Sequence, residues 1–239
     1  MKNMFDRCLK SFLYRTSDLL YTIFPKRSVL KFYCNTANVL RPVAWRLACK
    51  YYGPEIIKYR GGIDDFILSE IGKGDSVMDV GCAEGNLTAL LASKARSVVG
   101  VDMDDKYIEG IDRRIRCLEN VKFIKGDVID IDFKEVFDAA ILVHAIEHMS
   151  DCAVILRKLS GISRKIIIET PDPDSDCILK ILNDLGVRDL GDDKHFQLFD
   201  RKTLKDALEK NGWKEVVIST GDATVRAVAR SVAFGGGKA

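Results

Sequence analysis

The chain has 239 residues, 47% of them hydrophobic and 30% charged, and carries a net charge of +2. This composition excludes a fibrous or intrinsically disordered chain, and the length suits one α/β domain with an accessory segment. The seven cysteines include no C-x-x-C pair, which predicts reduced thiols in a cytoplasmic protein. No apolar run approaches the ~18 residues of a membrane span, so we expect neither a transmembrane helix nor a secretory signal.

Residues 1–60 differ in composition from the rest of the chain. They hold 12 Lys and Arg against 3 Asp and Glu, a net charge of +9, and 11 of the 20 aromatic residues, whereas the remainder carries −7. Basic and aromatic residues together suit an anionic partner, such as a membrane surface, a nucleic acid or a phosphorylated substrate. A helical cap on the main domain, or a lid over the substrate, explains the composition equally well. We therefore predict a helical accessory or lid segment, with peripheral membrane contact as one of its candidate roles.

From Asp75 onward, short β-branched runs alternate with amphipathic stretches, as in a parallel sheet with crossover helices. The predicted strands are residues 76–80, 97–102, 121–124, 139–143 and 165–169. The predicted helices between them are residues 86–94, 105–117 and 151–159, with only a short connection near Phe133.

The C-terminal part completes the predicted fold. After Pro171-Asp-Pro-Asp interrupts the alternation, a helix is expected over residues 175–185, followed by a loop. Asp200 is the predicted N-cap of a helix over residues 201–211, which Gly212 closes, and residues 214–220 and 224–234 read as a hairpin. The fold class predicted for residues 61–234 is therefore α/β: a doubly wound, mainly parallel, seven-stranded Rossmann-like sheet with a C-terminal antiparallel hairpin, followed by a disordered tail over 235–239.

A glycine-containing loop joins the first predicted strand to the first helix, in the segment Val77-Met-Asp-Val-Gly-Cys-Ala-Glu-Gly-Asn86. Gly81 lets the chain turn sharply, and Gly85 lets the helix begin close to a ligand. The helix N-terminus carries partial positive charge. The loop is thus suited to hold an anionic or polar cofactor.

Two carboxylates follow at later strand ends. Asp102 ends the second strand about 20 residues beyond the glycines, where a carboxylate can accept hydrogen bonds from ribose hydroxyls. Asp127 and Val128 follow the third strand. The G-x-G-x-x-G spacing of nicotinamide-dependent dehydrogenases is absent, which disfavours that class.

These residues resemble the first motifs of class I S-adenosylmethionine-dependent methyltransferases, an acidic residue followed by G-x-G-x-G. Asp79, Gly81 and Gly85 match, and Ala83 stands where the family most often has its middle glycine. The resemblance implies S-adenosyl-L-methionine as cofactor, with Asp127 and Val128 beside the adenine. The predicted cofactor-binding residues are Asp79, Gly81, Cys82, Ala83, Gly85, Asn86, Asp102, Met103, Asp127, Val128 and Val143.

The end of the fourth strand carries two of the three histidines of the chain, His144 and His148, together with Glu147. If residues 143–149 turn helically, these three side chains share one face, and with His195 they form a four-ligand nitrogen and oxygen site for a metal. Alternatively, His148 packs under the sheet and His195 is a hydrogen-bonding loop residue. The H-x-x-E-H string also matches inverted zincin proteases. That motif requires a long helix, whereas here it begins at a strand end, which disfavours a protease.

The same region resembles quinone-biosynthesis and related small-molecule O-methyltransferases, in which E-x-x-E-H follows strand four and H-x-x-x-F stretches occur later. In some such families, including small-RNA 2′-O-methyltransferases, these positions bind a divalent metal that engages the acceptor hydroxyl. The resemblance implies O-methylation of a small or lipid-linked acceptor, with His144, Glu147 and His148 as catalytic residues.

His144 is the predicted base, since histidine has an unperturbed pKa of about 6.5. Two alternatives stay open. One is an RNA 2′-O-methyltransferase that uses the basic N-terminal segment, and the other is a catalytically inactive cofactor-binding protein on the same fold.

Overall fold

The computed structural model describes residues 2–34, 36–37, 40, 62–173, 196–221 and 224–234. The chain divides into two compact units, residues 1–54 with 176–193, and residues 55–175 with 194–239. The predicted helix over 175–185, His195 and the predicted tail over 235–239 lie outside the described residues. The boundary predicted after residue 60 does too, and it stays a prediction.

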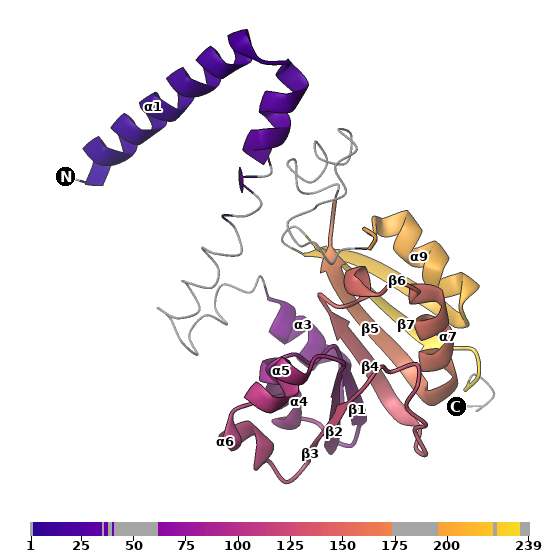
Figure 1. Ribbon diagram of the computed structural model, residues 1–239. Helices are drawn as coiled ribbons and strands as arrows, with labels where there is room; N and C mark the ends of the chain where they lie inside the picture. The colour runs from indigo at the N-terminus through magenta and orange to yellow at the C-terminus, as the bar shows by residue number, and fades with distance from the viewer. Residues whose placement is uncertain are drawn as a thin grey trace. The chain divides into compact units, whose positions relative to one another are not determined.

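The described part of the first unit is helical. Helix α1 spans Lys2–Ile23, and residues 26–34 form further helical turns after a break at Phe24 and Pro25 (Figure 1). Proline cannot donate a backbone hydrogen bond, so it suits the start of the second helical stretch, where the Pro25 carbonyl accepts from the amide of Ser28.

The second unit is built on a seven-stranded sheet with the strand order β3-β2-β1-β4-β5-β7-β6 (Figure 1). Strands β1 to β5 are parallel, and β7 pairs antiparallel with both β5 and β6. The strands are β1 (Ser76–Val80), β2 (Ser97–Asp102), β3 (Val121–Lys125), β4 (Phe137–Val143), β5 (Ser163–Pro171), β6 (Trp213–Gly221) and β7 (Thr224–Ser231). The predicted fold class, with its C-terminal antiparallel hairpin, is confirmed.

The helices of this unit are short and connect the strands. They are α3 (Ile63–Glu70), α4 (Asn86–Ala92), α5 (Asp105–Gly110), α6 (Arg113–Arg116), the 3₁₀ turn η2 (Ile146–His148), α7 (Cys152–Ile162) and α9 (Arg201–Lys210).

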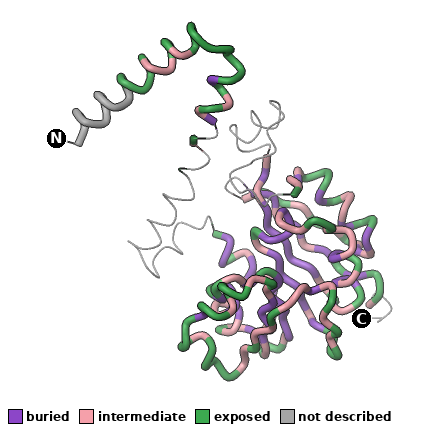
Figure 2. Tube along the Cα trace, viewed as in Figure 1, coloured by how far each residue is buried: buried purple, intermediate pink, exposed green. Residues whose placement is uncertain are grey.

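Alternate residues of the central strands face two separate cores, as strand geometry requires. Val77 packs with Ile67 of α3 and Leu91 of α4 on one face. Met78 belongs to the core of the opposite face, which includes Leu156 of α7 together with residues of α9. Figure 2 shows the strands as the buried interior of this unit. Helices on both faces leave the carboxyl ends of the parallel strands as the open edge, where a ligand crevice forms.

One predicted helix is wrong in its extent. Residues 105–117 form two short helices, α5 and α6, rather than one. The break lies at Ile111, which is buried, and at Asp112, whose carboxylate caps the second helix by accepting from the amide of Arg114 at 2.7 Å. Ile111 and Asp112 have ψ of 128° and 135°, outside the helical range, so the chain leaves the first helix there and Asp112 caps the second.

The predicted N-cap of the last helix is confirmed. Asp200 accepts from the amide of Thr203 at 2.7 Å, and the Thr203 hydroxyl accepts from the amide of Asp200 at 2.9 Å, which completes a capping box. Gly212 follows this helix with φ of 91°, the left-handed conformation expected of a glycine after a helix.

Replacing Leu156 by alanine should destabilise the second unit. The side chain is fully buried between α7 and the sheet, so its truncation leaves a cavity and is expected to lower the free energy of unfolding by about 2–5 kcal/mol. Urea denaturation followed by circular dichroism measures the change. The control is Val217→Ala, since Val217 is 64% exposed and its truncation should change the free energy little. Equal effects of the two variants would contradict this assignment of the core.

Candidate functional site

The glycine loop after β1 has a left-handed, closely packed conformation. Gly81, Ala83 and Gly85 have φ of 78°, 45° and 77°. The amide of Gly81 donates to the carbonyl of Val101 at 2.8 Å, which ties the loop to β2. A Cβ at Gly81 would lie 2.9 Å from the Cβ of Ala145, so only glycine allows the loop to approach the end of β4 this closely.

Ala83 occupies the position where a glycine is most common in the family that the motif resembles, and its geometry explains that preference. Its φ of 45° is left-handed, which costs a non-glycine residue roughly 1–2 kcal/mol. The amide of Ala83 donates to Oδ2 of Asp102 at 2.9 Å, and this charge-assisted hydrogen bond offsets part of the strain. The loop therefore keeps its conformation with alanine in this place.

Asp102 is positioned by backbone amides at the end of β2. Its Oδ2 accepts from Ala83, and its Oδ1 accepts from the amide of Asp104 at 2.9 Å. The residue is only half-buried, and each carboxylate oxygen offers two lone pairs. Asp102 can therefore accept further hydrogen bonds from a pair of ribose hydroxyls at the open edge of the sheet.

The other predicted cofactor residues differ in exposure. Asp127 is half-buried and accepts from the amide of Ile129 at 2.9 Å, and Val128 beside it is buried. Val143 is half-buried, whereas Asn86 at the start of α4 and Met103 after β2 are exposed. All lie on segments that follow the carboxyl ends of β1 to β4, or end those strands.

Buried negative charge characterises the floor of this site. Asp79 is 1% exposed, and its Oδ2 accepts from the Thr88 hydroxyl at 2.6 Å. Burial, followed by the charges of Asp79 and Asp102, raises the pKa of the Cys82 thiol, so that this thiol stays neutral. Thr88 was not among the sequence predictions, because a threonine inside a helix gives no motif signal.

These residues fit S-adenosylmethionine. Asp102 matches a ribose diol, the glycine loop presents backbone at close range, and the negative charge of Asp79 and Asp102 suits a ligand that carries a sulfonium and an ammonium group. The residues lie where β1 has β2 on one side and β4 on the other, the point at which the strand order reverses.

His144 lies at the end of β4 between two buried carboxylates. Its Nδ1 is 3.5 Å from Oε1 of Glu147, and its Nε2 is 3.9 Å from Oε1 of Glu169. The imidazole is 51% exposed, while the side chains of Glu147 and Glu169 are 1% and 4% exposed. The imidazole is thus half-exposed and has a buried carboxyl group near each of its two nitrogens.

The backbone of His144 is strained as well. Its φ is 48°, an uncommon left-handed value for a histidine, and its amide donates to the carbonyl of Glu169 at 2.9 Å. Strained non-glycine residues cluster at functional sites, where the surrounding structure maintains them.

Glu147 is fixed from both sides. Its Oε2 accepts from the Thr170 hydroxyl at 2.9 Å, and its other oxygen faces His144. Burial acts to raise the pKa of Glu147, but the hydrogen bond and charge of His144, with smaller contributions from the backbone and Thr170, hold the pKa below its ordinary value. Glu147 therefore carries a negative charge at neutral pH.

Glu169 is held by an arginine from the antiparallel hairpin. Its Oε2 accepts from Nε of Arg226 at 2.7 Å, and the guanidinium of Arg226 lies 5.1 Å from the ring centre of Phe66. Glu169 pairs with Val143 across β4 and β5, and with Arg226 across β5 and β7. Glu169 could have been predicted from the sequence, because it is an acidic residue at the end of the predicted strand 165–169. No sequence signal pointed to Arg226.

The predicted helical turn over residues 143–149 is wrong. Only Ile146–His148 form a 3₁₀ turn, because His144 is left-handed and Ala145 has φ of −126°. His144 and Glu147 still meet, through the bend of the chain rather than through helical spacing. His148 is half-buried, and its amide donates to the carbonyl of Ala145 at 3.0 Å.

The predicted metal site stays a prediction. In the part of the chain that the structure describes, no group of three or more His, Cys, Asp or Glu side chains is arranged to hold a metal ion. His195, the fourth predicted ligand, lies outside that part. The amide of Phe196, the next residue, donates to the carbonyl of Glu147 at 2.9 Å, which places Phe196 beside the site.

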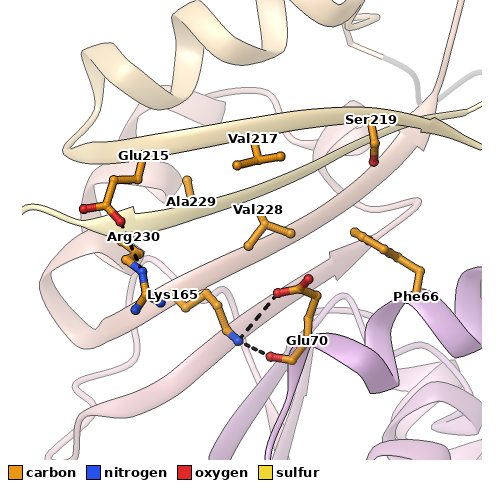
Figure 3. Close-up of a pocket in the computed structure, with 9 residues that line it drawn as sticks. All are labelled: Phe66, Glu70, Lys165, Glu215, Val217, Ser219, Val228, Ala229 and Arg230. Carbon is orange, nitrogen blue, oxygen red and sulfur yellow. Dashed lines mark hydrogen bonds and ion pairs between the residues drawn. The ribbon is translucent and has the colours of Figure 1, made fainter.

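A separate cavity of about 310 Å³ lies over α3 and strands β5, β6 and β7 (Figure 3). Figure 3 shows two ion pairs at its wall: Nζ of Lys165 lies 3.8 Å from Oε2 of Glu70, and Nε of Arg230 lies 3.2 Å from Oε2 of Glu215. The residues that line it include none of the predicted cofactor or catalytic residues. The cavity is therefore distinct from the site at the strand ends.

Comparisons with known proteins agree with this geometry. A family model described as "Methyltransferase domain" matches residues 20–218. The probable ribosomal RNA small subunit methyltransferase A of Methanosarcina acetivorans is 32% identical over 75 residues, which cover 31% of this chain and 28% of that protein. The (S)-tetrahydroprotoberberine N-methyltransferase of Eschscholzia californica is 31% identical over 96 residues, 38% and 27% of the two chains. The chain thus matches less than a third of the length of these relatives.

Solved structures share the fold. The YcgJ protein from Bacillus subtilis has a TM-score of 0.57 and 17% identity, with 66% of this chain and 70% of that chain covered. The N-terminal domain of EvdMO1 with SAH bound has a TM-score of 0.55 and 18% identity, with 72% and 80% covered. At these identities the likeness concerns the fold alone.

Glu147→Gln should make stability less dependent on pH. Because the folded-state pKa of Glu147 is lowered, its charge stabilises the fold above the ordinary glutamate pKa of about 4.3, and that contribution is lost as the pH falls through the lowered folded-state value. The variant should thus melt at a lower temperature than the parent at pH 7, with a gap that narrows as the pH falls below about 4. Thermal melts over this range measure it, with Glu119→Gln as an exposed control. A gap that is the same at pH 7 and at low pH would refute the assignment.

Proposed function

This chain belongs to the methyltransferase domain family, and from that premise we propose that it transfers the methyl group of S-adenosyl-L-methionine to a hydroxyl group of a small or lipid-linked acceptor. The observation that carries the choice of a hydroxyl is the half-exposed imidazole of His144 against two buried carboxylates. This arrangement suits a general base, which a hydroxyl acceptor needs more than an electron-rich amine does.

The cofactor supplies a methyl group activated by the positive sulfur. Residues of this chain would hold it through the glycine loop, through Asp102 toward the ribose and through the segment at Asp127 and Val128 toward the adenine. The close contact of Gly81 with Ala145 joins the cofactor loop to the segment that carries His144. The donor and the base therefore share one edge of the sheet.

His144 removes the proton of the acceptor hydroxyl. Nδ1, the nitrogen nearer Glu147, carries a proton toward that carboxylate, which leaves Nε2 to take the proton of the acceptor. When bound, the cofactor would supply an activated methyl group to the deprotonated oxygen held at this edge of the sheet, and its product would be S-adenosylhomocysteine. Glu147 and Glu169 stabilise the imidazolium that results, as a carboxylate does beside a catalytic histidine.

RNA is a second candidate acceptor, and a specific observation favours it. Residues 1–60 carry a net charge of +9, and similar proteins include a probable ribosomal RNA methyltransferase. A protein that binds RNA phosphates through these residues loses affinity steeply as salt rises, whereas small-acceptor turnover does not. An amine acceptor, to which the alkaloid N-methyltransferase points, belongs in the same acceptor screen.

Asp102→Ala should abolish most of the affinity for S-adenosylhomocysteine. The variant loses charged hydrogen bonds to the ribose and the bond that steadies Ala83, so the Kd should rise at least about tenfold. Isothermal titration calorimetry measures the change in Kd, and a separate titration with NAD is the nucleotide control. Asp132→Ala is the matched control, because that carboxylate is exposed and follows β3 outside the site.

The titration separates the proposals. A parent that binds S-adenosylhomocysteine but not NAD, with binding lost only in Asp102→Ala, supports the cofactor site. A parent that binds S-adenosylhomocysteine but transfers no methyl group to any acceptor would favour the inactive cofactor-binding protein. Failure of the parent to bind S-adenosylhomocysteine would overturn the proposed function.

His144→Gln should lower turnover without weakening cofactor binding. Loss of a general base typically costs about 10²–10⁴-fold in rate, and the affinity for S-adenosylhomocysteine should stay within about twofold, since His144 belongs to the acceptor side. Release of S-adenosylhomocysteine with an acceptor from the screen measures the rate. The parent should also gain activity over pH 5–8, where imidazoles lose their proton, and the variant should lose that dependence. Full turnover in the variant would rule out His144 as the base.

A further inference from the structure

Helix α1 exposes an apolar face. Phe12, Thr16, Leu19, Leu20 and Ile23 recur at spacings of three and four residues, which places them on one side of the helix. Phe12, Leu19 and Ile23 are 63%, 59% and 63% exposed. In Figure 2 the coloured part of this helix is mostly green, the colour of exposed residues. A helix with this pattern normally covers its apolar side against another surface.

Cations accompany this face. Between residues 11 and 34 the chain has Arg15, Lys26, Arg27 and Lys31 against the single acid Asp18, a net charge of +3. Nζ of Lys26 lies 5.6 Å from the ring centre of Tyr21. Basic side chains beside an apolar helix face suit the boundary between anionic lipid headgroups and acyl chains.

The helix does not have the character of a membrane span. Among the described residues, no helix is long and apolar enough to cross a bilayer. The opposite side of α1, with Tyr14, Asp18 and Tyr21, is polar. An amphipathic helix of this kind lies in the plane of the interface.

We propose that α1 and the helical residues 26–34 form a docking surface for an anionic phospholipid bilayer. Phe12, Leu19 and Ile23 enter the boundary of the acyl chains, and the basic residues contact the headgroups. The inference goes beyond the proposed methyl transfer and does not depend on it, because vesicle binding requires no turnover.

The observations favour lipid over two other partners. RNA would pair with the cations but would leave the aliphatic side chains of Leu19 and Ile23 in water. A second copy of the chain would cover the apolar face, but pairing two segments that each carry +3 brings like charges together. An anionic bilayer satisfies both the apolar face and the charge.

Co-sedimentation of the full chain with vesicles tests the proposal. The parent is expected to pellet with vesicles in which about a third of the phosphatidylcholine is replaced by phosphatidylglycerol, and to pellet less with phosphatidylcholine alone and at high salt. Phe12→Ser should lower the partition coefficient about tenfold, since it removes one large side chain from the acyl boundary. Tyr14→Ser is the matched control, because Tyr14 is 68% exposed on the polar side, and it should change binding by less than about twofold.

A second variant and a fold control keep the test decisive. Lys26→Gln with Lys31→Gln should weaken binding to the anionic vesicles and leave binding to phosphatidylcholine unchanged, and circular dichroism melts should show that every variant is folded. A parent that stays in the supernatant with both vesicles would overturn the proposal. So would equal losses in Phe12→Ser and Tyr14→Ser, or a parent dimer in size-exclusion chromatography that Phe12→Ser alone dissociates.

Discussion

The close approach of Gly81 to Ala145 is the contact on which the site depends. A single methyl group at Gly81 would lie 2.9 Å from the Cβ of Ala145, so the loop after β1 and the segment after β4 meet only because one of them has no side chain. In a doubly wound sheet these two strands are neighbours at the point where the strand order reverses. The cofactor loop and the proposed base are therefore brought together by the sheet topology and kept together by one glycine.

Charge and strain are concentrated around this contact. His144 and Ala83 both have left-handed backbones, and each is held by a hydrogen bond to an acidic residue: His144 to the Glu169 carbonyl, and Ala83 to the Asp102 carboxylate. Left-handed backbone in non-glycine residues is costly, and it persists where the surrounding bonds compensate. The antiparallel hairpin takes part through Arg226, which forms an ion pair with Oε2 of Glu169. The hairpin thus supports the site as well as extending the sheet.

The uneven distribution of charge along the chain separates two tasks. Among the charged side chains of the site, carboxylates predominate, which suits a cofactor with a positive sulfur, whereas the N-terminal helices are basic and expose an apolar face. A net charge of +2 for the whole chain conceals this difference. The basic segment is the proposed membrane contact, and the acidic strand ends are the proposed site of methyl transfer.

The sequence by itself determined the fold class and the alternation of strands and helices along the chain, and it pointed to the cofactor motif, because hydrophobic period, glycine positions and strand-end carboxylates are local signals. It did not determine that residues 105–117 form two helices, since the burial of Ile111 depends on what packs above it. Nor did it reveal the partners of His144. Glu169 is 25 residues away along the chain, and the register of β5 with β4 brings it to the imidazole. Arg226 is 82 residues away, and the register of β7 with β5 brings it to Glu169. Helical spacing suggested the contact between His144 and Glu147, but the left-handed backbone of His144 produces it. The sequence could not show this, because residue spacing carries no signal of a left-handed backbone.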